Sequence, residues 1–315
     1  MGKLRAVLYP HWAANLNEVA TGTKESFKGW LGRKDYVVSS FDATSSRFEL
    51  YALDPVAVVT GIAHDIDRFT CASFESVAGI AANGEIANAR AWPLIRAYYA
   101  AFFAAHAFTR IFGRSLSTLG RDETAALRLT ARQSGFLDFH VHEKLYVFSL
   151  SADGRTITAQ PFDGGPHLDT WKQLRILLGD LQTAILTASA PTLPAQEVSG
   201  FLAHLASLLA HDNPNGSFLS KVRNGLNYRH DYGAWYPVGV GPHWAEVDRC
   251  LRAFSHDPLG GMQEPMTKPI ARFANGCAMV VGMNAELVRE LVERHPKNRS
   301  FLQPRTTILL EAIGG

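Results

Sequence analysis

The stretch that decides the fold reads Arg96-Ala97-Tyr98-Tyr99-Ala100-Ala101-Phe102-Phe103-Ala104-Ala105-His106-Ala107. Its alanines allow neighbouring helices to approach closely, and its aromatic side chains supply a large area for burial. A helix that is apolar on all sides is buried, so this one is expected at the centre of the molecule. We predict that it runs from about Ile86 to Phe112, with Pro93 as a kink or as its first turn. His106 is expected to be a core histidine with hydrogen-bonded ring nitrogens.

Segments on both sides of this helix have readable patterns. Asp54-Pro55 places a capping residue before a proline at the first helical position, so a helix is predicted to begin there. Residues 136–162 have strand-like apolar positions around the turn signal Asp153-Gly154, which predicts a β-hairpin. Residues 36–53 also favour extended structure. The segment Thr306–Leu310 is predicted to be a short strand.

The composition is typical of a folded, soluble protein. Hydrophobic residues make up 47% of the 315 residues and charged residues 19%, which argues against wholesale disorder. The net charge of +2 is too small to indicate nucleic-acid binding by itself. Cys71, Cys250 and Cys277 lie far apart and form no C-x-x-C motif, so neither a disulfide framework nor a cysteine-rich zinc site is predicted. Because neither a signal peptide nor a membrane-spanning run is readable, the cytoplasm is the expected location.

A second informative segment reads Lys221-Val222-Arg223-Asn224-Gly225-Leu226-Asn227-Tyr228-Arg229-His230-Asp231-Tyr232. On an α-helix, Arg223 and His230 would be about 20° apart around the axis, so both side chains would leave one face. An arginine can hold a phosphate there, and a histidine can move a proton near neutral pH. Similar Arg/His spacings recur elsewhere in the chain, so spacing alone does not identify a site. The structural alternative is a helix end at which Arg223 pairs with a carboxylate and His230 caps the terminus.

The residues around this pair resemble a known family. Asn224 directly follows Arg223, and Tyr232 lies two positions after His230. This order resembles the Arg-Asn-x-x-x-x-His-x-Tyr signature of the HEPN superfamily (higher eukaryotes and prokaryotes nucleotide-binding), with the Arg–His spacing at the long end of the family's range. The Tyr-Tyr-Ala-Ala-Phe run of the apolar helix is similar to the family's first core helix. The resemblance covers roughly residues 86–236.

The resemblance implies a mainly α fold. It would be a HEPN-like up-and-down helical bundle with an inserted β-hairpin and with N- and C-terminal extensions. The bundle would occupy residues 86–236, with the hairpin at about 136–162. Residues 1–85 would be an N-terminal extension of mixed strand and helix, and residues 237–315 a helical C-terminal extension. Two chains would form a homodimer in which both Arg/His pairs meet at the dimer cleft.

The resemblance also implies an activity. Members with the intact motif are metal-independent endoribonucleases, common in toxin–antitoxin and antiphage defence systems, and they need no cofactor. Arg223 would stabilise the phosphate, and His230 would take the proton of the ribose 2′-OH or protonate the leaving oxygen. Asn224 and Tyr232 would support the pair, and in some toxin members the matching tyrosine is modified with AMP. Basic residues expected to attract the RNA backbone are Arg96, Lys221 and Arg229.

Two other functions remain open. A catalytically silent helical module could bind RNA, a nucleotide or a protein partner. A metal site is the weaker alternative, because His140 and His142 would point to the same face of a strand, as metal ligands often do. For the ribonuclease, the expected partners are RNA, a second copy of the chain and an antitoxin or regulatory protein, and no membrane is expected.

Overall fold

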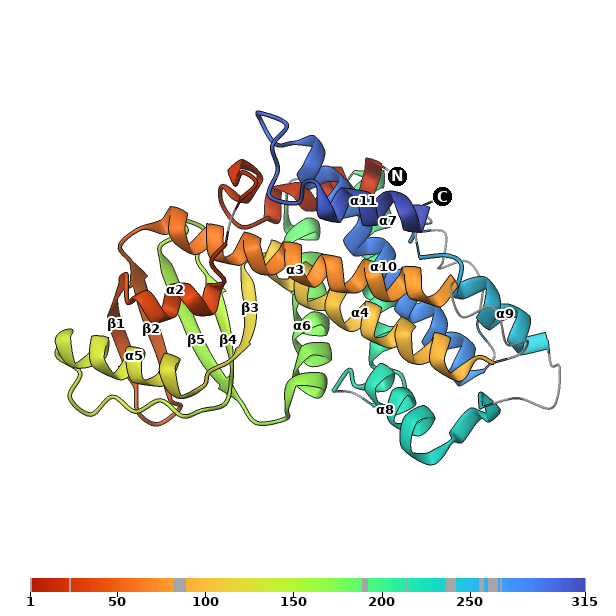
Figure 1. Cartoon of the computed structure of the whole chain (residues 1–315), viewed down its shortest axis with the longest axis horizontal. Helices are drawn as coiled ribbons and strands as arrows, with labels where there is room; N and C mark the ends of the chain where they lie inside the picture. Colours follow the sequence, from red (N-terminus) through yellow and green to blue (C-terminus); the bar gives the residue numbers. More distant parts are fainter. Residues whose placement is uncertain are drawn as a thin grey trace.

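The computed structural model describes residues 2–22, 24–81, 89–188, 192–213, 215–235, 242–254, 258–259, 266 and 268–314. These residues form a five-stranded antiparallel sheet at one end of the molecule and a group of packed helices at the other (Figure 1). The fold is therefore mixed α and β. The prediction of a mainly α, HEPN-like bundle with one inserted hairpin is wrong.

The sheet has the strand order β1-β2-β5-β4-β3. The predicted hairpin is confirmed as β4 and β5, but it is no isolated insertion, because Leu50 of β2 pairs with Ile157 of β5. The hydrophobic periodicity of a segment identifies a strand but does not show which other strand it pairs with. Here the paired strands come from distant parts of the chain. β3 was not predicted because it contains a single large apolar residue, Leu116, among polar ones. The strands are β1 (Tyr36–Asp42), β2 (Arg47–Ala52), β3 (Arg114–Thr118), β4 (Leu145–Leu150) and β5 (Thr156–Phe162).

Helices α2 and α5 cover one face of the sheet, and the long helix α3 runs from the sheet into the helical part (Figure 1). The predicted start of α3 is confirmed, since Asp54 Oδ1 accepts a hydrogen bond from the Val56 amide at 2.9 Å. No helix among the described residues is long and apolar enough to cross a lipid bilayer. The helices are α1 (Gly2–Leu8), α2 (Phe27–Arg33), α3 (Pro55–Ala81), α4 (Ala91–Ile111), α5 (Arg121–Gln133), α6 (Pro166–Thr187), α7 (Leu193–Leu209), α8 (Phe218–Asn224), α9 (Pro242–Cys250), α10 (Pro269–Glu293) and α11 (Arg305–Gly314).

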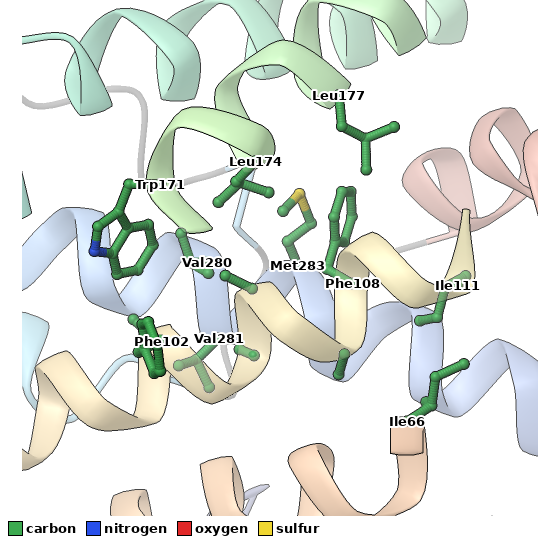
Figure 2. Packing of buried hydrophobic residues seen from close by; sticks show 14 of the residues in the cluster. Ile66, Phe102, Phe108, Ile111, Trp171, Leu174, Leu177, Val280, Val281 and Met283 are labelled. Atoms are coloured by element: carbon green, nitrogen blue, oxygen red, sulfur yellow. The ribbon is translucent and has the colours of Figure 1, made fainter. Parts of the chain in front are cut away.

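Helix α4 is the central helix of the helical part, as predicted from its apolar surface. It packs against α3, α6 and α10, and Pro93 lies in its first turn. The predicted start at Ile86 lies outside the described residues. His106 is confirmed as a core histidine, because Nδ1 lies 3.2 Å from Arg110 Nη1 and Nε2 lies 3.1 Å from Thr170 Oγ1. The packed side chains labelled in Figure 2 are Ile66, Phe102, Phe108, Ile111, Trp171, Leu174, Leu177, Val280, Val281 and Met283.

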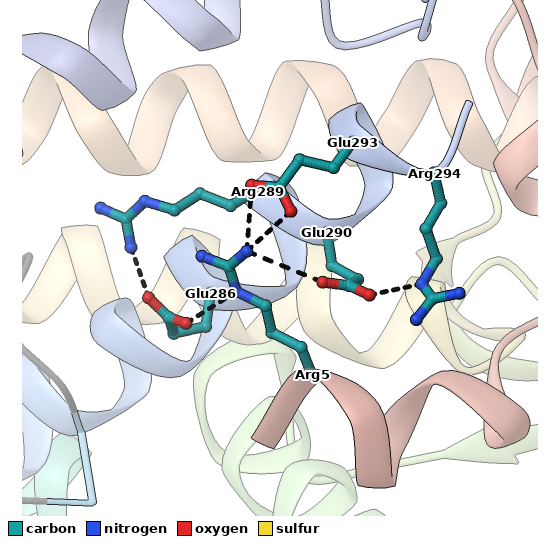
Figure 3. Close-up of polar contacts among 6 residues, drawn as sticks. All are labelled: Arg5, Glu286, Arg289, Glu290, Glu293 and Arg294. Carbon is teal, nitrogen blue, oxygen red and sulfur yellow. Dashed lines mark hydrogen bonds and ion pairs between the residues drawn. The ribbon is translucent and has the colours of Figure 1, made fainter. Parts of the chain in front are cut away.

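The two ends of the described chain pack on this helical part through polar contacts. Arg5 of α1 forms ion pairs with Glu286 at 2.9 Å and Glu293 at 3.0 Å, both on α10 (Figure 3). The predicted strand at Thr306–Leu310 is wrong, because this segment lies in α11. Thr306 donates a hydrogen bond to Asp67 of α3 at 2.6 Å, so packing on α3 overrides the local preference for extended structure.

Candidate functional site

The segment around Arg223 is not one continuous α-helix. Helix α8 ends at Asn224, a π-helical turn spans Gly225–Arg229, and His230 has a left-handed backbone with φ 54°. After the turn the chain folds back on Gly225, where an added Cβ would lie only 2.9 Å from atoms of Asp231 and Tyr232. The π-turn and the helix end change the angular spacing of the residues. The expectation that Arg223 and His230 leave one helix face is therefore wrong.

Arg223 points into the helical part and contacts the tyrosine pair of α4. Its side chain is only 9% exposed. Nη2 donates a hydrogen bond to the Tyr99 hydroxyl at 2.6 Å, and Nη1 donates one to Asn224 Oδ1 at 2.8 Å. The guanidinium lies 5.5 Å from the ring centres of both Tyr98 and Tyr99 and 5.8 Å from that of Tyr228. The segment that contains Arg223 thus packs on the Tyr-Tyr-Ala-Ala-Phe run of α4.

The charge of Arg223 has no negative partner in the part of the chain that the structure describes. No Asp or Glu there forms an ion pair with it, and its Nε is buried without a hydrogen-bond partner. Burial lowers the pKa of Arg223, but the hydrogen bond to Tyr99 and the nearby phenol groups raise it above its ordinary value, so the side chain stays charged. Burying an unpaired cation is costly. The alternative of a purely structural helix end requires a carboxylate that pairs with Arg223, and none is found among the described residues.

A second histidine, which the sequence did not single out, lies beside this cluster. His167 is in the first turn of α6 and is half-buried. Its Nδ1 lies 2.9 Å from the Tyr98 hydroxyl, which also accepts a hydrogen bond from Trp171 Nε1 at 3.1 Å. Its ring centre is 4.5 Å from that of Phe102. Pro166 signals a helix start, but nothing local indicates that this turn packs on Tyr98.

His230, the predicted catalytic histidine, points elsewhere. It is exposed, and its ring packs against Trp235 with centres 5.4 Å apart. Trp235 is held by a hydrogen bond from its Nε1 to the Leu226 carbonyl at 2.8 Å, and it also contacts Trp92. Within the described residues, none of the contacts of His230 is to Arg223.

The remaining predicted residues are dispersed. Arg96 donates a hydrogen bond to the Gly79 carbonyl of α3, and Arg229 forms an ion pair with Asp231 at 3.2 Å. Lys221 is exposed on α8. Tyr232 is half-buried with φ 70°, and its pKa is raised by burial and by Asp231. The structure brings Arg223 and Asn224 together at the tyrosine pair and leaves the other predicted residues outside it.

The histidines proposed as metal ligands do not lie on a strand. His140 and His142 are exposed in the irregular segment before β4, and the His140 ring packs against Phe41 with centres 5.5 Å apart. Across the described residues, no group of three or more His, Cys, Asp or Glu side chains could hold a metal ion. The geometry that motivated the metal site is therefore missing.

A pocket of about 490 Å³ lies at a different place, near the start of α3. Its walls are mostly small apolar residues, with Glu18 and Asp153 as the acidic side chains and no lysine or arginine. An RNA phosphate would be repelled by such a lining. The lining residues are Ala14, Asn15, Glu18, Val19, Ala20, Thr21, Gly22, Pro55, Val56, Val59, Thr60, Asp153 and Gly154.

Comparisons with known proteins do not assign this arrangement. No protein-family model, no curated protein and no solved structure matches the chain. The chemistry of the Arg223 cluster must therefore be inferred from its own residues.

Proposed function

We propose that this chain is a metal-independent endoribonuclease that uses the Arg/His chemistry of HEPN ribonucleases. The observation that carries the proposal is the Arg223 guanidinium, which is buried, charged and without a carboxylate partner among the described residues. A phosphate of RNA would supply the missing negative charge. Arginine has five N–H donors, and Tyr99 and Asn224 use only two of them, so donors remain for phosphate oxygens.

The proposed reaction is an internal transfer of the phosphodiester. The ribose 2′-oxygen forms a bond to phosphorus, and the bond from phosphorus to the 5′-oxygen of the next nucleotide breaks. A histidine takes the proton of the 2′-OH, and the leaving 5′-oxygen receives a proton. The products are a 2′,3′-cyclic phosphate and a 5′-OH. Arg223 would stabilise the extra negative charge on the phosphoryl oxygens in the transition state.

Exposed aromatic side chains near Arg223 support RNA as the ligand. Tyr228, whose ring lies beneath the guanidinium, is 73% exposed, and Trp92, which contacts Trp235, is 60% exposed. Bases of single-stranded RNA stack on such rings with little dependence on sequence. A phosphate at Arg223 would thus lie close to a base stacked on Tyr228, whose ring is 5.8 Å from the guanidinium.

The test is cleavage of total RNA by purified protein in EDTA. We expect products with 2′,3′-cyclic phosphate ends, and a rate at least about 100-fold lower for Arg223→Ala, as is typical when a transition-state charge stabiliser is lost. The matched control is Arg132→Ala, which removes an exposed arginine of α5 on the sheet side of the molecule. Absence of cleavage by the wild-type protein, or cleavage that EDTA abolishes, would overturn the proposal.

A catalytically silent RNA-binding module is the second candidate. The observation that favours it is the separation of His230 from Arg223, which leaves the predicted catalytic pair unassembled within the described residues of one chain. Fluorescence anisotropy with a labelled RNA separates the two functions. Binding that depends on Arg223 while the RNA stays intact would favour the binding module.

The biological setting is part of the same proposal. We infer a bacterial toxin–antitoxin or antiphage system, a location in the cytoplasm where RNA is available, and a homodimer controlled by an antitoxin or regulatory protein. Growth arrest on expression that is relieved by Arg223→Ala would support this setting. Normal growth at high expression of active enzyme would contradict it.

A further inference from the structure

His167 and Arg223 share a pair of neighbouring tyrosines, because His167 is hydrogen-bonded to the Tyr98 hydroxyl and Arg223 to the Tyr99 hydroxyl. Arg223 lies 5.5 Å from the ring centres of Tyr98 and Tyr99, and the His167 ring lies 5.7 Å and 6.1 Å from the same two centres. Arg223 comes from α8 and His167 from α6. These helices pack on α4 and also contact each other, so tertiary packing brings the two residues to the same tyrosines.

We propose that His167 accepts the proton of the ribose 2′-OH and acts with Arg223 of the same chain. This inference rests on the proposed ribonuclease function and assigns the base of its first step. The 2′-OH proton moves to His167 Nε2, the 2′-oxygen bonds to phosphorus, and the 5′-oxygen leaves with a proton from water.

The hydrogen bonds of His167 suit a group that exchanges protons. Nδ1 is engaged with the Tyr98 hydroxyl, while Nε2 has no hydrogen-bond partner among the described residues. A hydroxyl both donates and accepts, so the bond to Nδ1 persists whichever nitrogen carries the proton. Trp171 Nε1 and the ring of Phe102 restrict the orientation of Tyr98 and His167. The His167 ring is thus held in one orientation, and its Nε2 remains available to accept a proton.

The surroundings of His167 favour its neutral form. Burial lowers its pKa, and the positive charge of Arg223 lowers it further, so the imidazole is neutral at pH 7 and able to accept a proton. Burial raises the pKa of Tyr98 to about 12, so this phenol is neutral too. Among the described residues, other titratable groups close to His167 are Tyr99 and buried His106 on α4, and Tyr228 lies beside Arg223.

His230 is left with a different part in RNA binding. Its ring extends the row formed by Trp235 and Trp92. His230 and Trp235 lie on the segment that follows Arg223, and Trp92 lies in the first turn of α4. Such a row can stack on a base of the substrate. Loss of His230 should therefore weaken RNA binding more than it slows bond cleavage.

The experiment compares His167→Gln with His230→Gln in single-turnover cleavage of a labelled RNA in EDTA, across pH 5 to about 8. We expect His167→Gln to lower the rate at least about 100-fold and to abolish the fall of the rate at acidic pH. We expect His230→Gln to lower the rate less than about tenfold. Affinity for a 2′-O-methyl RNA, which cannot be cleaved, should be unchanged by His167→Gln, and added imidazole should partly restore cleavage by His167→Gly.

A measurement on the wild-type protein covers the possibility that the variants fold poorly. Diethyl pyrocarbonate modifies accessible histidines, and bound 2′-O-methyl RNA should protect His167, as read by peptide mass spectrometry. Wild-type rates in a folded His167→Gln variant, or modification of His167 that RNA does not slow, would overturn the inference while the ribonuclease stands. Absence of RNA cleavage by the wild-type protein would instead overturn the proposed function, and with it the role of His167 as its base.

Discussion

Arg110, which belongs to α4, and Arg223, which packs on α4, are two buried arginines with different partners for their charge. Arg110 is 2% exposed and Arg223 is 9% exposed, and both lie over aromatic rings. Arg110 lies 3.8 Å from Asp65 and donates hydrogen bonds to the carbonyls of His106 at 3.0 Å and Leu116 at 2.7 Å. Arg223 has only neutral partners among the described residues.

We interpret this difference as the one between a structural arginine and the proposed ligand-binding arginine. Burial lowers the pKa of Arg110 to about 10 although Asp65 opposes this, so Arg110 stays a cation at neutral pH. Asp65 also forms an ion pair with the exposed Arg68 at 3.3 Å. This cluster joins α3, α4 and β3, which are the elements where the sheet meets the helical part. At Arg223 the compensating charge is absent from the described residues, and an anionic ligand is the natural source of it.

The largest effect that tests this comparison is expected on stability. Arg110→Met should lower the free energy of unfolding by about 3 kcal/mol. The buried guanidinium and its hydrogen bonds to two carbonyls are lost, and buried Asp65 is left with the exposed Arg68 as an ion-pair partner. Arg223→Met should change it by less than about 1 kcal/mol, because no buried carboxylate loses a partner there. Urea unfolding followed by circular dichroism measures both values. Equal losses would mean that Arg223 is as structural as Arg110.

The next effect concerns ligand-linked stability. A 2′-O-methyl RNA at 100 times its dissociation constant should stabilise the wild-type protein by about 2.7 kcal/mol. The same concentration should not stabilise Arg223→Met, because the phosphate would lose its cation, whereas Arg132→Met should respond like wild type. Unfolding curves with and without the RNA measure the difference. Stabilisation of Arg223→Met to the wild-type extent would show that the anion binds elsewhere.

A smaller effect on stability is expected when the pH is lowered, through His106, which contacts Arg110. Burial lowers the pKa of His106 well below its ordinary value, and the charge of Arg110 lowers it further. As the pH falls below about 6.5, His106 binds a proton in the unfolded chain but stays neutral in the folded chain. The free energy of unfolding therefore falls by at most about 1.4 kcal/mol per pH unit. Urea unfolding at several pH values should show a shallower acid dependence for His106→Gln. An unchanged slope in that variant would exclude His106 as the cause.

The smallest effect is expected at the hydroxyl that orients Arg223. Tyr99→Phe removes the hydroxyl that accepts the hydrogen bond from Arg223 Nη2. The affinity for RNA should therefore fall by about fivefold, corresponding to roughly 1 kcal/mol. The matched control is Tyr36→Phe, whose hydroxyl donates to the Leu31 carbonyl beside the sheet. Anisotropy titrations with labelled RNA compare the two variants. A similar change in both would show that loss of the Tyr99 hydroxyl has no specific effect on binding.

Features set by a few neighbouring residues were predictable. Asp54-Pro55 starts α3, and Asp153-Gly154 forms the turn between β4 and β5, because capping and turn geometry depend on local side chains. The apolar run of α4 was recognisable because a helix with no polar face must be buried. The partners of the strands were not predictable, and β3 was missed, because pairing is decided between distant segments.

The candidate site divides in the same way. The sequence by itself determined that Arg223 is followed by Asn224 and that a tyrosine pair lies on an apolar helix able to receive it. Only the tertiary structure decided that His167 lies at that tyrosine pair, that His230 turns away, and that no described carboxylate reaches Arg223. The physical reason is that a buried charge is balanced by all the groups that packing brings close to it in space. The spacing of residues along the sequence does not reveal which groups these are.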